Sequence, residues 1–390
     1  MAFNSSGHFS TNLTPLSGSG SRNHSILNPE SSQFYVAIRR LQTVMLPLIC
    51  VFGLVGNSLA VRTFLVKSLR SSSCSLYLAA KCTSDSGFLL SLLVIWLYRV
   101  GVQLFNMQGI CQMTVFLTYT CGFSSVWFVT IITCENYIRI AHPTKVVTCC
   151  TASRAKVVIS AVFAVAGGVN AFPLWTSRVI TTKVPSGGNN QTSSVTMCMA
   201  LKDYQNLVIA MTYVDTVFTL ILPSLIISIM VLAIVQSVLR SLKRRKRLRA
   251  GTQRAPGIRR TTTPQAKMTR FLFAISVIFL LLHTPSHAIR LKMMIETYAF
   301  NQQPGFNDHI FHRSFELLYY LNFCNNVVVY LVFGDKFREI FSMVFCARLK
   351  RNQSEEMQTE CRMLVVHADG TETIALRDGD NGREKEGDNH

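Results

Sequence analysis

Apolar residues in this chain are gathered into seven long blocks, and polar segments separate each block from the next. The blocks cover about residues 41–66, 75–98, 112–133, 156–175, 207–239, 271–295 and 315–333. A membrane-spanning helix needs about 20 mainly apolar residues, and backbone that crosses lipid must satisfy its own hydrogen bonds. The pattern therefore predicts an all-α membrane protein, folded as a seven-transmembrane helix bundle.

Composition agrees with this prediction, and the distribution of charge adds an orientation. Only 15% of the 390 residues are charged, whereas soluble domains have about 25%. Residues 240–270 contain twelve Lys or Arg and neither Asp nor Glu, which places that loop in the cytoplasm. With seven spans, the N-terminus is then outside the cell and the C-terminus inside. The net charge of +19 indicates topology and contact with membrane lipids rather than nucleic-acid binding.

Glycosylation sequons and cysteines divide between the two predicted sides. Sequons begin at Asn4, Asn12, Asn23 and Asn190, all on the outer side. Of twelve cysteines, only Cys111 and Cys198 face that oxidising side, so we expect one disulfide between them. We expect an extracellular, glycosylated and disordered tail (1–38), a transmembrane domain (39–346) and a disordered cytoplasmic tail (347–390).

Polar side chains inside the blocks are candidates for function, because lipid-facing helices need none. Asp85 lies midway along the second block, and residues at similar depth are Asn57, Ser125, Asn322 and Asn326. A carboxylate among amides and a hydroxyl is suited to a buried cation, and a sodium ion near Asp85 is the expected occupant. The alternative is a set of interhelical hydrogen bonds, each worth about 1 kcal/mol.

The ordered motifs of this chain resemble those of the rhodopsin-like (class A) G protein-coupled receptors over residues 35–346. The matching positions are Gly56-Asn57, Asp85 eight residues after Tyr77, Cys111 placed 24 residues before Glu135, Pro143, Pro223, Phe279 with Pro285, and Tyr330 followed by Phe337-Arg338. The resemblance implies a short amphipathic eighth helix, a heterotrimeric G protein and arrestin as partners, and an outward swing of the sixth helix. Cys346, just after the eighth helix, is either palmitoylated or an unmodified thiol.

The chain departs from the family's pattern at the positions on which the family's switching depends. Its third helix ends in Glu135-Asn136-Tyr137, where the family has arginine in the middle, and Val327 stands where the seventh helix has proline. Arg139 lies three residues after Asn136 on nearly the same face, so we expect it to take over part of the missing arginine's role. The residues expected to act in G protein coupling are Glu135, Asn136, Tyr137, Arg139 and Tyr330.

Residues at matching positions exclude two ligand classes and favour a third. A light receptor needs a lysine where this chain has Tyr320, and amine receptors carry an aspartate where it has Thr118. The segment VTCCTASRAKVVI after the third block is similar to the peptide-receptor branch, including thyrotropin-releasing-hormone, FMRFamide-type and achatin-like invertebrate neuropeptide receptors. A short peptide is therefore the expected ligand.

Charged side chains near the outer ends of the helices indicate the chemistry of that peptide. Arginines would attract a carboxylate and Glu316 would accept an amine, so we expect a peptide with an acidic group and a free N-terminus. The alternatives are that Arg99 pairs with Glu316 inside the protein and that the other arginines extend to the surface. Aromatic side chains near them would either line the ligand pocket or only pack between helices. The candidate ligand-binding residues are Arg99, Gln112, Thr118, Tyr119, His283, His287, Arg290, Arg313, Glu316 and Tyr320.

The function expected from these features is that of a multi-pass plasma-membrane receptor, activated by a neuropeptide and signalling through G proteins. The alternative is a non-signalling or arrestin-biased scavenger receptor, because arginine is missing at Asn136 and proline at Val327. A transporter or channel is disfavoured, since the sequence has no inverted repeat and no ring of pore-lining charge. No nucleophile constellation or metal-ligand spacing is present, so we expect no enzyme, no catalytic residues and no metal ligands beyond the sodium site.

Overall fold

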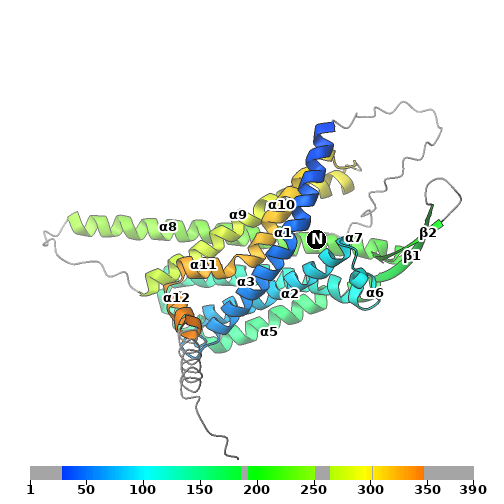
Figure 1. Cartoon of the computed structure of the whole chain (residues 1–390). Coiled ribbons are helices and arrows are strands. Elements are labelled where there is room, and N and C mark those ends of the chain that lie inside the picture. The colour runs from blue at the N-terminus through cyan, green and yellow to red at the C-terminus, as the bar shows by residue number, and fades with distance from the viewer. Residues whose placement is uncertain (1–28, 186–191, 251–263, 301, 347–390) are drawn as a thin grey trace, which may run out of the picture. The chain divides into compact units, whose positions relative to one another are not determined.

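The computed structural model of the chain describes residues 29–185, 192–250, 264–300 and 302–346 (Figure 1). The chain divides into two units, residues 1–338 and 339–390. The long helices are α1 (Pro29–Phe64), α2 (Ser73–Arg99), α3 (Ile110–Ala141), α5 (Ala152–Val169), α7 (Gln205–Asp215), α8 (Leu222–Ala250), α9 (Pro264–Tyr298), α10 (Phe306–Cys324) and α11 (Asn326–Phe333). Short elements are η1 (Gln103–Asn106), η2 (Pro143–Lys145), α4 (Val146–Cys149), α6 (Pro173–Thr176), η3 (Lys202–Tyr204), η4 (Thr216–Ile221), α12 (Asp335–Phe341) and η5 (Ser342–Cys346).

The apolar blocks of the sequence correspond to membrane-spanning helices. Six helices of the described part are long and apolar enough to cross a membrane, and α10 with α11 makes a seventh if that bent pair counts as one span. The short π-helix η4 joins α7 to α8 within the fifth span, which runs from Lys202 to Arg244. The chain is a multi-pass membrane protein, and the predicted seven-helix bundle is confirmed, with the short helix α12 after the seventh span.

The first helix is longer than the apolar block that predicts it. It begins at Pro29, so residues 29–38, which the sequence assigns to the tail, are helical. Packing explains the extension, because the Tyr35 ring lies 5.7 Å from the Phe306 ring of α10 and Ile38 is buried. Residues 1–28 and 347–390, and with them Asn4, Asn12 and Asn23, lie outside the described residues.

Helices α2 and α3 form the interior of the bundle. In the apolar stretch of α3, 67% of the residues are buried, and in α2 61%, but in the fourth span only 22%. Helix α3 contacts α2, α5, α8 and α9, while α1 packs on α2 and α10. Between α2 and α10 the rings of Phe88 and Phe323 stack with centroids 3.9 Å apart. Two neighbouring spans thus carry the core, and the other helices surround them.

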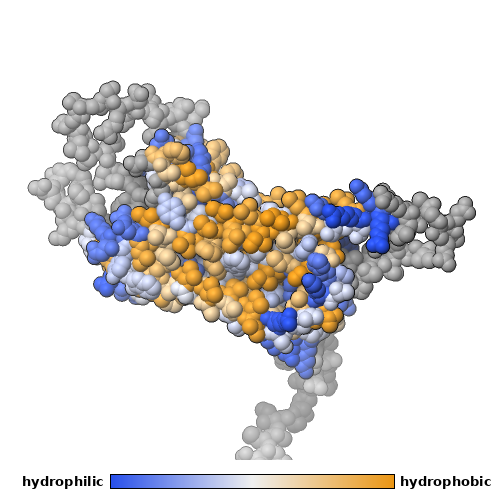
Figure 2. Space-filling view, turned by 180° about the vertical axis from the view of Figure 1, so that it is seen from behind, coloured by the Kyte–Doolittle hydropathy of each residue, from blue (hydrophilic) through white to orange (hydrophobic). Residues whose placement is uncertain are grey.

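Apolar side chains also cover the outer surface, as expected for contact with lipid. Large exposed apolar residues lie along α1 and α8, including Leu48, Val51, Ile229 and Leu232. Figure 2 shows one face of the molecule, on which orange apolar side chains cover the middle and blue hydrophilic ones lie toward the two ends. Contiguous exposed apolar surface of this extent is rare on soluble monomers.

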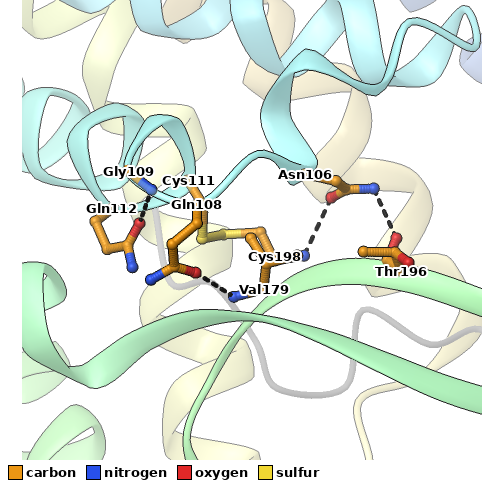
Figure 3. Close-up of a disulfide and its surroundings, with 8 residues drawn as sticks. All are labelled: Asn106, Gln108, Gly109, Cys111, Gln112, Val179, Thr196 and Cys198. Carbon is orange, nitrogen blue, oxygen red and sulfur yellow. Dashed lines mark hydrogen bonds between the residues drawn. A yellow bond between two sulfur atoms is a disulfide. The ribbon is translucent and has the colours of Figure 1, made fainter.

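A hairpin and a disulfide close one end of the bundle. Strands β1 (Ser177–Pro185) and β2 (Thr192–Ala200) pair antiparallel, with Val179 opposite Cys198. The predicted disulfide between Cys111 and Cys198 is present and ties the start of α3 to β2 (Figure 3). Asn106 supports the junction, because it accepts a hydrogen bond from the Cys198 backbone N–H and donates one to the Thr196 carbonyl. Asn190 lies between the strands, outside the described residues.

The seventh span bends by 59° between α10 and α11, although Val327 replaces the proline that the resemblance leads us to expect. A helix bend needs partners for the backbone groups that it frees. Asn57 of α1 supplies one, since its Nδ2 donates to the Phe323 carbonyl at 2.9 Å. Gly56 makes that approach possible, because a Cβ at this position would lie 2.7 Å from a Val327 methyl group.

We expect Asn57→Ala to lower the free energy of unfolding by about 1–3 kcal/mol, because it leaves a buried carbonyl without this partner. The measurement is thermal unfolding of the purified protein in lipid nanodiscs. Ser58→Ala is the matched control, since the exposed Ser58 hydroxyl donates only within its own helix, to the Leu54 carbonyl. Equal effects of the two substitutions would contradict this account of the bend.

Candidate functional site

The two ends of α3 define two ends of the bundle. We call the end with Cys111–Cys198 the disulfide end and the opposite one the Glu135 end. Midway between them lies the central polar cluster, which consists of Asn57, Lys81, Asp85, Ser125 and Asn326. It brings together polar side chains from α1, α2, α3 and α11.

Asp85 is the centre of this cluster, and its side chain is fully buried. Its Oδ1 accepts a hydrogen bond from Ser125 of α3 at 2.5 Å, and its Oδ2 accepts one from Asn326 of α11 at 2.6 Å. The Asn326 amide also donates to Asn57 Oδ1 at 2.8 Å. Four of the five residues that the sequence proposes for this site therefore meet. The fifth, Asn322, is buried, and its amide nitrogen has no hydrogen-bond partner among the described residues.

Lys81 is the member of the cluster that the sequence analysis missed. Its Nζ lies 2.5 Å from Asp85 Oδ2 and 2.9 Å from Asn326 Oδ1, and its side chain is only 2% exposed. The sequence does contain a signal for this pair, because opposite charges four residues apart in a helix lie side by side.

Arg290, a candidate for ligand binding, is paired within the protein. Its guanidinium donates to Asp215 Oδ2 at 3.0 Å and so links α9 to α7. The side chains are 17% and 6% exposed, so the pair is largely shielded from water. Asp215 is a second residue that the sequence analysis missed, although a carboxylate inside an apolar block is itself a signal.

His283 and His287 lie next to this ion pair along α9. Their rings form a hydrogen bond of 2.9 Å between Nδ1 of His283 and Nε2 of His287. The Tyr319 ring of α10 packs on both, with centroid distances of 5.0 and 5.7 Å, and Phe279 stacks on His283 at 3.9 Å. The Nε2 of His283 is buried and has no partner in the described part of the chain. The sixth and seventh spans thus meet through a partly polar aromatic layer.

Glu316 forms a second charged group at the disulfide end, with partners other than the Arg99 that the sequence considers. It accepts hydrogen bonds from the Tyr320 hydroxyl at 2.6 Å, from Arg313 at 3.2 Å and from Gln42 of α1 at 3.3 Å. Arg99 is exposed at the end of α2. Three of the candidate residues, Arg313, Glu316 and Tyr320, are therefore in contact.

The remaining candidates lie along α3, where each supports local structure. Gln112 Oε1 accepts a hydrogen bond from the Gly109 backbone N–H at the start of the helix (Figure 3). Thr118 donates to the Ser91 hydroxyl of α2 at 2.9 Å. The Tyr119 ring packs on Phe172 beside the disulfide, with centroids 5.6 Å apart. These residues frame the disulfide end but do not belong to either charged group there.

Arg139 contacts Glu135, which lies four residues before it in α3, a pair that the sequence did not lead us to expect. The guanidinium lies 3.3 Å from Glu135 Oε2 and 3.2 Å from the Ser73 hydroxyl of α2. Glu135 also accepts hydrogen bonds from the Ser73 hydroxyl at 2.8 Å and the Cys74 thiol at 3.2 Å. The pair therefore joins α3 to the start of α2.

Asn136 instead faces the sixth span. Its Nδ2 donates to the Thr269 carbonyl of α9 at 3.3 Å, and one helical turn away the Thr133 and Ser276 hydroxyls lie 2.7 Å apart. A third contact of α9 at this end is exposed and goes to α12 instead of α3. Lys267 of α9 lies 3.1 Å from Asp335 of α12, and its hydrogen bond lowers the pKa of the Asp335 carboxyl. Uncharged hydrogen bonds thus form the buried links of α9 to α3 at the Glu135 end.

Aromatic packing surrounds Tyr330, the other residue proposed for coupling. Its buried ring contacts Phe64, Phe271 and Phe337, with centroids 5.1 to 5.7 Å away. The Cys82 thiol and the Tyr330 hydroxyl lie 3.7 Å apart. Tyr137 is partly buried, and its ring lies 6.0 Å from the His142 ring. Cys346, the proposed palmitoylation site, is the last residue of η5, and its side chain is not described.

Comparison with known proteins fits this arrangement. Residues 56–330 match the family described as 7 transmembrane receptor (rhodopsin family). The chain is 23% identical over 312 residues to the somatostatin receptor type 3 of Rattus norvegicus, which covers 79% of this chain and 69% of that receptor. It is 26% identical over 254 residues to the FMRFamide receptor of Drosophila melanogaster, which covers 64% of this chain and 42% of that receptor.

The Asp215–Arg290 pair gives a testable measure of coupling between the fifth and sixth spans. In a double-mutant cycle with Asp215→Asn and Arg290→Gln, we expect a coupling energy of about 1–3 kcal/mol, because each single change leaves a largely buried charge unpaired. Thermal unfolding in nanodiscs measures the four midpoints. The exposed Asp335–Arg338 pair is the control, with an expected coupling of about 0–1 kcal/mol. Additive effects at Asp215 and Arg290 would show that the pair does not hold the two spans together.

Proposed function

Because the chain belongs to the rhodopsin family of seven-transmembrane receptors, we propose that it is a plasma-membrane receptor for a short neuropeptide and activates heterotrimeric G proteins. The relatives named for somatostatin and FMRFamide support a peptide as the ligand. The proposed orientation has the disulfide end outside the cell and the Glu135 end in the cytoplasm. The basic residues between 240 and 250, at the end of α8, support it.

The observation that carries this proposal is the contrast between the two ends of the bundle. At the disulfide end, charges of both signs are paired within the protein, as Arg290 with Asp215 and Arg313 with Glu316. At the Glu135 end, α9 is held to α3 by uncharged hydrogen bonds. A charged ligand can act at the disulfide end by replacing one partner of an ion pair. At the Glu135 end the sixth span can move, because its links to α3 are weak.

The acidic group of the peptide would bind Arg290 in competition with Asp215. A carboxylate can take a bidentate position on a guanidinium, whereas Arg290 and Asp215 share a single hydrogen bond. Release of Asp215 would loosen α9 from α7, and the peptide's N-terminal amine would find its countercharge at Asp215 or Glu316. The ligand then stabilises the conformation in which the sixth span has swung outward, because it binds that conformation better.

Removal of Arg290 tests the acidic group directly. We expect Arg290→Ala to raise the peptide concentration needed for half-maximal nucleotide exchange by at least about tenfold, the effect of roughly 1.4 kcal/mol. The assay uses purified receptor in nanodiscs, a panel of neuropeptides and a panel of purified G proteins, with surface expression checked separately. The matched comparison is the same peptide with its acid converted to an amide, which should lose potency on the native receptor and lose little more on Arg290→Ala. Unchanged potency for both Arg290→Ala and Arg99→Ala would sink the acidic-peptide proposal.

Substitutions at the Glu135 end test the coupling roles. We expect Arg139→Ala to reduce peptide-driven nucleotide exchange more than Asn136→Ala does, because Arg139 is the cation that contacts Glu135. Asn136→Ala removes a link between α3 and α9, so we expect it to raise exchange in the absence of peptide. Thr144→Ala, at an exposed position after α3, serves as the control. The reverse order of Arg139→Ala and Asn136→Ala would rule out the proposed role of Arg139.

A scavenger or arrestin-biased receptor is the second candidate, and one observation favours it. Position 136 is an uncharged asparagine in contact with α9, so this end has no arginine at the position where the family carries one. The same exchange assay separates the two functions. Peptide binding without exchange on any G protein would favour the scavenger.

A further inference from the structure

We propose that Lys81 acts as a tethered cation that replaces a bound sodium ion at Asp85. The Lys81 ammonium contacts the Asp85 carboxylate at 2.5 Å and the Asn326 carbonyl oxygen at 2.9 Å. Both charged side chains are buried, at 2% and 0% exposure. The cation that this carboxylate needs is therefore part of the protein itself.

The oxygen atoms that would coordinate a sodium ion already have N–H or O–H donors. Asp85 Oδ1 accepts from Ser125, and Oδ2 accepts from both Lys81 and Asn326. The Asn326 carbonyl oxygen accepts from Lys81, and the Asn57 carbonyl oxygen accepts from Asn326. Alkali and alkaline-earth ions are bound by several oxygen ligands at once. Here a sodium ion would have to displace an ammonium of the same charge, so the cluster does not fit the sodium ion that the sequence suggests.

The position of Lys81 explains why its ammonium stays in place. Lys81 and Asp85 are one helical turn apart on α2, so the countercharge comes from the same helix as the carboxylate. From there the ammonium reaches across to Asn326, which begins α11 just after the bend of the seventh span. A dissolved ion can leave such a site, whereas a lysine side chain remains attached. The contact between α2 and α11 is thus independent of the salt outside the cell.

Sodium itself is the probe that tests this inference. The purified full-length protein in nanodiscs is unfolded by heat in NaCl and in choline chloride at equal ionic strength, with KCl as a further comparison. We expect the native protein to have the same midpoint in the three salts. We expect Lys81→Met to have a lower midpoint in choline chloride and to recover by several degrees in NaCl, with a saturable dependence on concentration. Removal of the ammonium leaves Asp85 unpaired, and a small cation can then enter.

The double variant Lys81→Met with Asp85→Asn is the matched control. It removes both charges together, which proteins tolerate better than the loss of one partner, so it should fold and show no response to sodium. Sodium-specific stabilisation of the native protein, similar to that of Lys81→Met, would overturn the proposal. So would a Lys81→Met protein that sodium does not stabilise, or one that folds in neither salt while the double variant folds. Unfolding needs neither peptide nor G protein, so this result is independent of the proposed function.

Discussion

A carboxylate inside a membrane-spanning bundle must find its countercharge and its hydrogen bonds within the protein, because lipid supplies neither. At Asp85 this requirement brings four spans to one point: Lys81 on its own helix, Ser125 on α3, Asn57 on α1 and Asn326 on α11. The cluster also supports the bend of the seventh span. The Asn326 amide, which donates to Asp85, and the Asn57 amide, whose oxygen accepts from Asn326, both donate to the Phe323 carbonyl at the bend. Loss of the Asp85–Lys81 pair would therefore affect α1 and α11 as well as α2.

This cluster also shows how a motif can change while the structure that it serves is kept. The seventh span bends without a proline at position 327, and side chains beside the bend donate to the Phe323 carbonyl. Asn57 reaches the carbonyl across the helix interface, and Gly56 lets the two helices approach. A missing motif residue is thus weak evidence for a lost function, since what matters is whether the freed backbone group has a partner.

Much of the fold could be predicted from the sequence. An apolar block of about 20 residues is long enough to cross the membrane, and in lipid its backbone must form a helix to satisfy its own hydrogen bonds. The disulfide was predictable for a similar reason, since only Cys111 and Cys198 lie on one side of the predicted membrane. The ion pairs of the site were harder, because a partner has to be found among residues far apart in sequence. Arg290 pairs with Asp215 on another span, 75 residues away. Composition and motifs locate a charge, but helix packing decides its partner. Lys81–Asp85 and Arg313–Glu316 are exceptions, because in each pair the partner lies about one turn along the same helix.

The Glu135 end shows how the position of the arginine along α3 decides which helices its charged hydrogen bond joins. Hydrogen bonds with a charged partner are roughly twice as strong as those between neutral groups. Here the charged bond, from Arg139 to Glu135, lies within α3 and extends to Ser73 of α2. These two helices form the interior of the bundle. The bond that crosses to α9, from Asn136 to the Thr269 carbonyl, is uncharged and 3.3 Å long. The stronger interaction thus lies in the interior of the bundle, and the weaker one joins α3 to α9, the span that moves in the proposed mechanism. In the proposed mechanism, opening α9 therefore needs less ligand energy than it would if a charged arginine at position 136 made the contact with α9.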